Sequence, residues 1–290
     1  MKRCVLGCSV QGASHKRSET ECQDSLKKVE RDDGTIIMAV ADGHGSKSCP
    51  YSKTGSSIAV NVFCKVMESY LDSFAETPDM LLTILNREGD TKVAQTIDAE
   101  WKRRVLKSHS NNKRETPVDA DGEKLKDKVY AQYGTTLVGL LITPDFLFAL
   151  QIGDGDISYV NSNGADLILK TDKILGTETH SLCKLDSWKR AVSIVRRVKF
   201  ENDIPCLFML STDGFSNSYK NESEFERTCV DYYAMIKEHG ADAVQQSLKQ
   251  WLTETSEMGC GDDITVLMAY FSEDVFVPQS PSEEEVGNDG

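Results

Sequence analysis

Four aspartates stand at the ends of apolar segments that have the composition of buried strands. Asp42 follows IIMAVA, Asp154 follows FALQIG, Asp213 follows LFMLST, and Asp262 lies just before ITVLMAY. Aspartate is a poor strand residue, and a buried carboxylate is costly unless it is paired. Any one of these acids alone is explained by an Asx-turn or a helix N-cap. Four such aspartates constrain the fold, because it has to bring their carboxylates to a place where the negative charges are compensated.

The first of these acids ends a predicted hairpin. Residues 25–31 and 35–41 have the pattern of strands, and the Asp-Asp-Gly between them is a strong turn signal. In such a hairpin the numbers of facing residues sum to about 66, which places Asp24 opposite Asp42. One acid precedes its strand and the other follows the partner strand. Both are therefore expected at the same edge of the sheet.

The remaining acids follow the same reasoning. In the next predicted hairpin, over residues 135–153, Asp154 is expected to return beside Gly134. Asp213 ends its strand and Asp262 precedes its own, so these two meet if the strands run antiparallel. One edge of the sheet system is then expected to gather five carboxylates.

Five neighbouring carboxylates repel one another unless cations lie among them. Ligands that are all oxygen favour hard ions, Mg²⁺ or Mn²⁺, over zinc. Two such ions about 3.5–4 Å apart bridge and deprotonate a water molecule and clamp a phosphoryl oxygen. The acids therefore predict a site for metal-assisted chemistry on a phosphate.

The rest of the chain groups helices into blocks and strands into pairs. Apolar spacing predicts helices over residues 55–74, 78–86, 91–107, 222–238 and 241–257. Further strand pairs are expected at 157–160 with 165–170 and at 193–200 with 206–212, with a last strand at 264–271. Hairpins and grouped helices, without strict β-α alternation, indicate antiparallel sheets covered by helices.

Composition narrows the function classes. The chain has 290 residues and a formal charge of −13, which argues against nucleic acid or an anionic membrane as a partner. We find no apolar run of membrane-spanning length and no signal-peptide pattern. The nine cysteines are odd in number and lack a C-x-x-C pair, which favours reduced thiols and a cytoplasmic protein. The acidic segment 272–290 is predicted to be disordered.

Six motifs in one order resemble the metal-dependent protein phosphatases of the PP2C (PPM) family, bacterial branch. They are CQD (22–24), AVADGHG (39–45), YGTTLVGL (133–140), IGDGDISYV (152–160), LSTDGFSNSY (210–219) and GDDITVLMAYF (261–271). The resemblance implies an α+β fold, a four-layer αββα sandwich of two antiparallel sheets flanked by antiparallel helix pairs. It further implies hydrolysis of phosphoserine and phosphothreonine on proteins by a metal-bridging water, with two core Mn²⁺ or Mg²⁺ ions and a weaker third.

The resemblance also implies roles for individual residues. Asp42 matches the carboxylate that bridges both core metals, and Gly43 matches a residue that lends its carbonyl to one of them. Asp213 and Asp262 match the other ligands of the first metal. Asp154 matches the acid that, with Asp213, holds the third ion.

The motifs also indicate a proton donor, leave two adjacent candidates for one metal ligand, and differ from the family pattern at one position. His44 matches the residue that protonates the leaving alkoxide. Asp263 falls where the family has Asn or Asp, so Asp262 is the predicted ligand. Gln23 stands where many relatives have Glu, and an amide is the weaker ligand. The second metal is therefore expected to bind less tightly or to depend on Asp24 through water.

Phosphate capture is the larger departure. Many relatives place an Arg where this chain has Glu19, whose charge would repel the substrate. His15, Lys16 or Arg17 is expected to substitute, with His15 favoured; the alternative for Lys16 and Arg17 is a solvated basic cluster. Segment 172–190 lies where the family carries a mobile flap beside the metals, and we expect it to influence substrate choice.

Three functions follow, in order of preference. The first is a phosphatase domain over residues 1–271 that acts on phosphorylated proteins, the targets of a cognate Ser/Thr kinase or the kinase itself. The second is a pseudophosphatase that binds phosphoproteins or a kinase without turnover, for which Glu19 and Gln23 are the support. The third is a two-metal nuclease, which the acidic composition disfavours.

Overall fold

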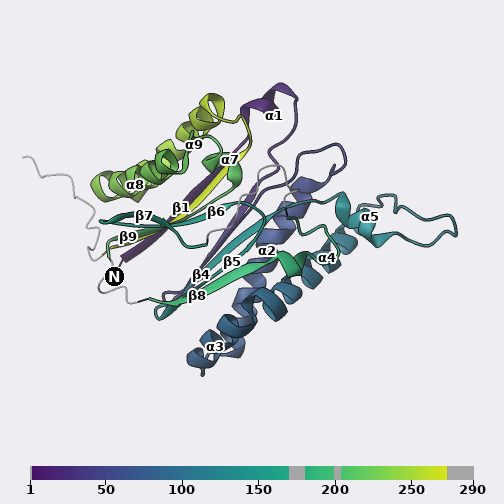
Figure 1. Cartoon of the computed structure of the whole chain (residues 1–290), viewed down its shortest axis with the longest axis horizontal. Helices are drawn as coiled ribbons and strands as arrows, with labels where there is room; N and C mark the ends of the chain where they lie inside the picture. The colour runs from purple at the N-terminus through teal and green to yellow at the C-terminus, as the bar shows by residue number, and fades with distance from the viewer. Residues whose placement is uncertain (1, 170–179, 199–203, 273–290) are drawn as a thin grey trace, which may run out of the picture.

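The computed structural model describes residues 2–169, 180–198 and 204–272, and within them the strands form two five-stranded antiparallel sheets (Figure 1). The first sheet has the order β1 (Lys2–Val10), β10 (Ile264–Ser272), β9 (Cys206–Ser211), β6 (Asp156–Asn161), β7 (Gly164–Leu167). The second has the order β2 (Ser25–Glu30), β3 (Ile36–Ala41), β4 (Leu137–Ile142), β5 (Phe146–Ile152), β8 (Val192–Arg197).

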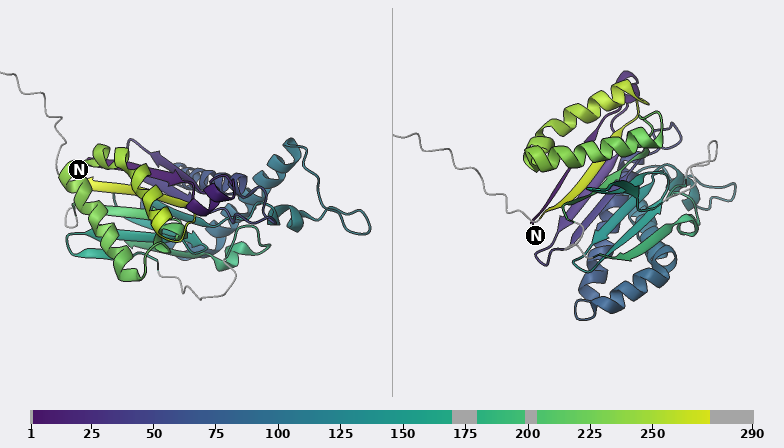
Figure 2. Two further views of the ribbon diagram at one scale, coloured as in Figure 1. Left: turned by 90° about the horizontal axis from the view of Figure 1, so that it is seen from above. Right: turned by 60° about the vertical axis from the view of Figure 1, so that its left-hand side comes forward.

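Helices cover the outer face of each sheet (Figure 2). The first sheet carries the helical hairpin of α8 (Glu222–His239) and α9 (Ala241–Met258). The second carries α2 (Ser52–Ser73), α3 (Pro78–Glu88) and α4 (Ala94–Asn111). Shorter elements are α1 (Ala13–Arg17), α5 (Lys126–Ala131), α7 (Asp213–Ser216), a π-turn (Gly89–Val93) and a 3₁₀ turn (Ser187–Arg190). The predicted αββα sandwich is confirmed.

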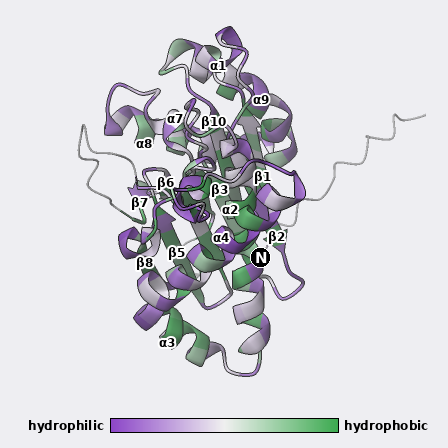
Figure 3. Cartoon of the chain, turned by 90° about the vertical axis from the view of Figure 1, so that its right-hand side faces the viewer, coloured by the Kyte–Doolittle hydropathy of each residue, from purple (hydrophilic) through white to green (hydrophobic). Residues whose placement is uncertain are grey.

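Strand β3 contains no polar residue because both of its faces are buried. Its residues Ile36, Met38 and Val40 face the core between the sheets, and the alternate residues face the core under α2. A strand that is covered on both faces has no solvent-facing side, so it is apolar throughout. Figure 3 shows hydrophobic strands inside and hydrophilic turns outside.

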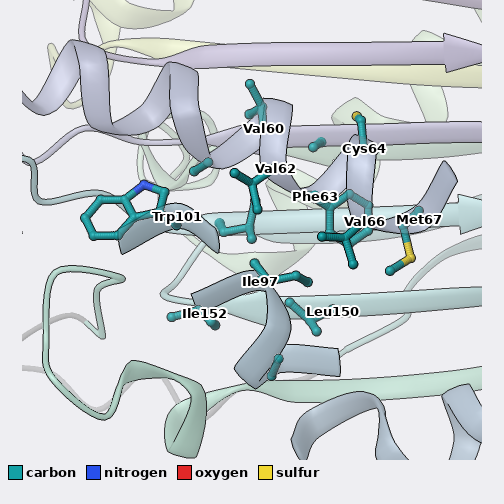
Figure 4. Close-up of a cluster of buried hydrophobic side chains, with 14 of the residues drawn as sticks. Val60, Val62, Phe63, Cys64, Val66, Met67, Ile97, Trp101, Leu150 and Ile152 are labelled. Atoms are coloured by element: carbon teal, nitrogen blue, oxygen red, sulfur yellow. The ribbon is translucent and has the colours of Figure 1, made fainter. Parts of the chain in front are cut away.

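The core under α2 is filled by large side chains from two helices (Figure 4). Phe63 of α2 packs above Gly139 of β4, where a Cβ atom would lie 2.3 Å from the Phe63 ring. Trp101 of α4 is fully buried, and its indole N–H donates to the main-chain oxygen of Gly55 at 3.0 Å. These contacts hold the first half of α2 firmly against the second sheet.

The first hairpin has the predicted register. Ser25 faces Ala41, so the next pair outward consists of Asp24 and Asp42. The β4–β5 hairpin differs by one residue, because its register brings Asp154 opposite Thr135 instead of Gly134. The main-chain N–H of Thr143 donates to the carbonyl oxygen of Phe146 at 2.8 Å, and the Thr143 hydroxyl accepts the N–H of Phe146 at 3.0 Å. Thr143 and Phe146 therefore form the last pair, and the turn is one residue shorter than the sequence suggested.

The predicted pairing of segments 193–200 and 206–212 is wrong. Strand β8 pairs with β5 in the second sheet, whereas β9 lies between β10 and β6 in the first. The reason is burial: β9 is buried along its whole length and suits a central position, while β8 exposes both ends and suits an edge. Strand β1, which the sequence analysis did not anticipate, pairs with β10.

Two predicted segments fall wholly or partly outside the described residues. In the acidic segment 272–290, residues 273–290 lie outside the described part. In the flap-like segment 172–190, residues 172–179 lie outside it. The described part of the latter is anchored, since Leu182 is buried and its N–H donates to Thr135. Of the helices described, none is both long and apolar enough to cross a membrane.

Candidate metal centre

The strand ends of both sheets meet at the end of the sandwich that Figure 3 faces. Strand β9 ends just before Thr212, and antiparallel β10 begins beside it. The Thr212 hydroxyl accepts the N–H of Thr265 at 3.0 Å and donates to Oδ2 of Asp24 at 2.7 Å. Because Asp24 leads into the other sheet, this hydrogen bond joins the two sheets at the edge where the acids collect.

Asp24 and Asp42 form the centre of the site. Asp24 is 1% exposed, and burial raises its pKa to about 7 despite hydrogen bonds to the carboxylate that lower it. The pKa of Asp42 is raised well above its usual range. Burial is the largest cause, and the charges of Asp24, Asp213 and Asp262 raise it further. The interaction between the two carboxyls lowers the pKa of Asp24 and raises that of Asp42. Without cations the pair is expected to share a proton near neutral pH.

The residues present fit a hard divalent ion. Oδ1 of Asp24 and Oε1 of Gln23 are buried acceptors without a hydrogen-bond partner among the described residues. Buried, unpartnered oxygens beside coupled carboxylates are the donors that Mg²⁺ and Mn²⁺ require. In the described part of the chain no three His, Cys, Asp or Glu side chains stand at metal-ligand spacing. The fit to a divalent ion therefore rests on the two unpartnered oxygens and on the charges that act on Asp42.

The two adjacent acids at 262 and 263 have different surroundings. Asp263 is 3% exposed; its Oδ1 accepts the N–H of Gly12 and its Oδ2 the N–H of Gln23, both at 2.7 Å. Its Oδ1 also lies 2.9 Å from Nδ1 of His15. Asp262 is the neighbour whose charge acts on Asp42. Asp263 therefore ties three segments together, which leaves Asp262 as the ligand candidate.

Loss of this tie has a predictable cost. Replacing Asp263 by alanine leaves two buried N–H groups without acceptors, which is expected to lower the free energy of unfolding by about 3 kcal/mol. Asp263→Asn keeps one acceptor oxygen and should lose about half as much. Urea denaturation in the presence of a chelator measures both. Equal stability of Asp263→Ala and wild type would contradict the assignment.

The loop after Asp42 is held by main-chain contacts. The main-chain oxygen of Asp42 accepts the Thr135 hydroxyl at 2.7 Å and the Thr136 N–H at 2.9 Å. The N–H of His44 donates to Gly134, where a Cβ would lie 2.4 Å from the His44 ring. The imidazole thus packs against a bare glycine. The sequence analysis did not identify the two threonines, because a hydroxyl that orients a ligand's main chain has no pattern of its own.

His15 faces the same loop. Gly45 has φ +58°, and a Cβ there would lie 2.8 Å from Oε1 of Gln23 and 3.3 Å from Nε2 of His15. Nδ1 of this imidazole lies beside Oδ1 of the buried Asp263 without a hydrogen bond, and Nε2 faces the loop at Gly45. Lys16, by contrast, pairs with Glu257 on the surface at 3.3 Å.

The other predicted site residues lie in turns, at a helix start or on the surface. Arg17 and Glu19 are exposed. Asp213 begins α7, and its Oδ2 accepts from Nδ2 of Asn217 at 2.9 Å. Asp154 lies in the turn that carries the chain from β5 to β6, next to Gly153 with φ +116°. The structure thus groups Asp213 and Asp262 electrostatically with the Asp24–Asp42 pair and leaves Arg17 apart.

Comparison with known structures identifies the same architecture elsewhere. The serine/threonine phosphatase of S. agalactiae matches with a TM-score of 0.58 and 15% identity, over 93% of this chain and 100% of that one. The catalytic domain of the phosphatase PstP, with two manganese ions, matches with a TM-score of 0.53 and 15% identity, over 93% and 99%. RsbX with magnesium matches with a TM-score of 0.51 and 14% identity, over 93% and 96%.

Sequence comparison is consistent with this result. No curated protein sequence matches the chain. The profile of the family described as protein phosphatase 2C, however, matches residues 11–253. That match covers most of the chain and includes every aspartate discussed above except Asp262 and Asp263. The chain therefore belongs to the protein phosphatase 2C family of protein serine/threonine phosphatases.

Proposed function

We propose that this protein hydrolyses phosphoserine and phosphothreonine esters on proteins with Mn²⁺ or Mg²⁺ held at the Asp24–Asp42 edge. The observation that carries the proposal is the charge interaction among four aspartates at four strand ends beside buried, unpartnered oxygens. The manganese of PstP and the magnesium of RsbX support these ions. The free cysteines, all nine within the described residues, support a reducing compartment such as the cytoplasm.

Asp42, Asp213, Asp262 and Asp24 would hold two core ions, with the Gly43 carbonyl as a further oxygen ligand. The ions would supply an activated water and neutralise charge on the phosphoryl oxygens. Around them the chain positions its own groups: Thr135 and Thr136 fix the main chain at Asp42, and Thr212 orients Asp24. Asp154 would contribute to a weaker third ion with Asp213.

His44 is proposed to donate a proton to the leaving alkoxide of the serine or threonine. Its main chain is held by Gly134 and its ring lies against that glycine, so the imidazole is oriented beside the acidic edge. A serine alkoxide is a poor leaving group at neutral pH, so a positioned acid is useful for it and less so for p-nitrophenolate.

His15 is proposed to contact the substrate phosphate in place of the arginine that many relatives have. His15→Gln is expected to raise KM for p-nitrophenyl phosphate and the inhibition constant of inorganic phosphate about tenfold, with kcat changed less. Arg17→Ala is the matched control, since this exposed side chain should leave both constants unchanged. A large effect of Arg17→Ala and none of His15→Gln would reverse the assignment.

The decisive test is metal-dependent turnover. The protein is expected to hydrolyse p-nitrophenyl phosphate and a phosphothreonine peptide with Mn²⁺ or Mg²⁺, and to lose both activities with excess chelator. The competing function is a binding module that recognises phosphoproteins without turnover. Phosphopeptide binding without hydrolysis under any divalent ion would favour that alternative.

A further inference from the structure

A groove of about 490 Å³ runs between α2 and α4 on the outer side of the second sheet. From α2 it is lined by Lys53 and Ser57, and from α4 by Arg104, Lys107 and Asn111. These residues recur three or four positions apart on each helix, so each set forms one helix face. The described residues that line the groove include three cations and no carboxylate.

This local charge is opposite to that of the whole chain, which has 46 acidic and 33 basic residues. Arg104 lies 2.7 Å from Glu100, but Glu100 is shared with Arg103 at 2.6 Å. Hydrogen bonds from both arginines lower the pKa of Glu100 to about 2, with that from Arg103 the stronger cause. Lys107 is exposed and makes no ion pair or hydrogen bond with any described residue. The groove therefore keeps a net positive charge.

The groove begins next to the candidate metal centre. The Lys53 ammonium donates to the main-chain oxygen of Asp24 at 3.1 Å, and the Ser56 hydroxyl donates to that of Gln23 at 2.5 Å. The guanidinium of Arg114, which does not line the groove, lies 3.5 Å from the centre of the Tyr51 ring, just before α2 begins. The N-terminus of α2 and the C-terminus of α4 lie together here, so their dipoles oppose. Side-chain cations therefore decide the sign of the local field.

We propose that this groove binds acidic residues that flank the phosphorylated residue of a protein substrate. The inference rests on the proposed phosphatase function and adds a substrate class to it. A short acidic segment interacts mainly with the nearby cations, because salt screens the rest of the chain beyond about 8–10 Å. A long polyanion such as nucleic acid would also meet the repulsion of the negatively charged chain.

The test compares two phosphothreonine peptides of equal length, one with glutamates and one with glutamines on both sides of the phosphate. Wild type is expected to have a kcat/KM about tenfold higher for the acidic peptide, mainly through a lower KM and only at low salt. In Arg104→Glu/Lys107→Glu this preference should disappear. Turnover of p-nitrophenyl phosphate should be unchanged, because neither side chain belongs to the metal centre.

The matched control is Lys237→Glu/Lys249→Glu, which makes the same charge change on exposed positions of α8 and α9. It is expected to keep the preference for the acidic peptide. Equal use of both peptides by wild type, or an equal loss in the control, would overturn the groove assignment while p-nitrophenyl phosphate turnover stayed intact. Absence of that turnover would instead refute the phosphatase function. In that case, weaker binding of the acidic peptide by Arg104→Glu/Lys107→Glu, measured by fluorescence anisotropy, still decides the groove.

Discussion

Replacing Asp42 by asparagine is expected to lower the Mn²⁺-dependent kcat/KM for p-nitrophenyl phosphate by at least about 1,000-fold. Asp42 is the carboxylate on which the charges of Asp24, Asp213 and Asp262 converge, so it is the proposed bridging ligand. An amide in its place carries no charge and cannot bridge two cations as effectively. Steady-state kinetics at saturating Mn²⁺ measure the loss.

The same substitution should have the opposite effect on stability when metal is absent. In the metal-free protein Asp42 must hold a proton or repel its neighbours, and asparagine does neither. Asp42→Asn is therefore expected to melt at a higher temperature than wild type in chelator at pH 8, and to gain less stability from added Mn²⁺. Asp145→Asn is the matched control, an exposed turn aspartate after β4 that should change neither property. An active Asp42→Asn enzyme would refute the proposed centre.

Without divalent cations, the stability of the protein is expected to fall as the pH rises from about 4 to about 8. The pKa of Asp24 rises from its ordinary value of 3.8 to about 7 in the folded chain, so the folded state holds a proton that the unfolded state releases. The stabilisation is complete below the unfolded pKa and is lost as the pH passes the folded pKa. The pKa of Asp42 is raised in the folded chain as well, so this carboxyl changes the stability in the same direction.

Urea midpoints in chelator and in Mn²⁺, at pH values between 5 and 8, test this expectation. Asp24→Asn should reduce the pH dependence seen in chelator, because asparagine does not titrate, and the remaining dependence comes from buried Asp42. Mn²⁺ should stabilise wild type more at pH 8 than at pH 5, since the ion competes with protons for the same oxygens. A midpoint that is independent of pH in chelator, or a slope in Asp24→Asn as steep as in wild type, would contradict the assignment.

The alternation of residues in a hairpin allowed the Asp24–Asp42 pair to be predicted from the sequence, but it did not place Asp154 correctly. The turn at 32–34 and the alternation of β2 and β3 require Asp24 to face Asp42, whatever surrounds them. The β4–β5 turn shows the limit, because a turn one residue shorter than expected moves Asp154 from Gly134 to Thr135. Local hydrogen bonds of Thr143 set that length, and composition alone does not reveal them.

Other features depended on contacts between segments that are distant in the chain. The pairing predicted for β8 and β9 was wrong because neighbouring strands in sequence were assigned to one sheet, whereas burial separates them. The choice between Asp262 and Asp263 was predicted only through the family resemblance. Its physical basis is that the N–H groups of Gly12 and Gln23 occupy Asp263.

The amino-acid order alone determined the strand and helix periods, the turn between β2 and β3, and the placement of aspartates at strand ends, because these depend on neighbours a few positions away. The tertiary structure alone decided which sheet each strand joins, and that Thr212 reaches Asp24 across the sandwich. It also decided that cations from α2 and α4 share one groove. Such contacts arise from the packing of surfaces far apart in the chain, and local sequence patterns carry no record of that packing.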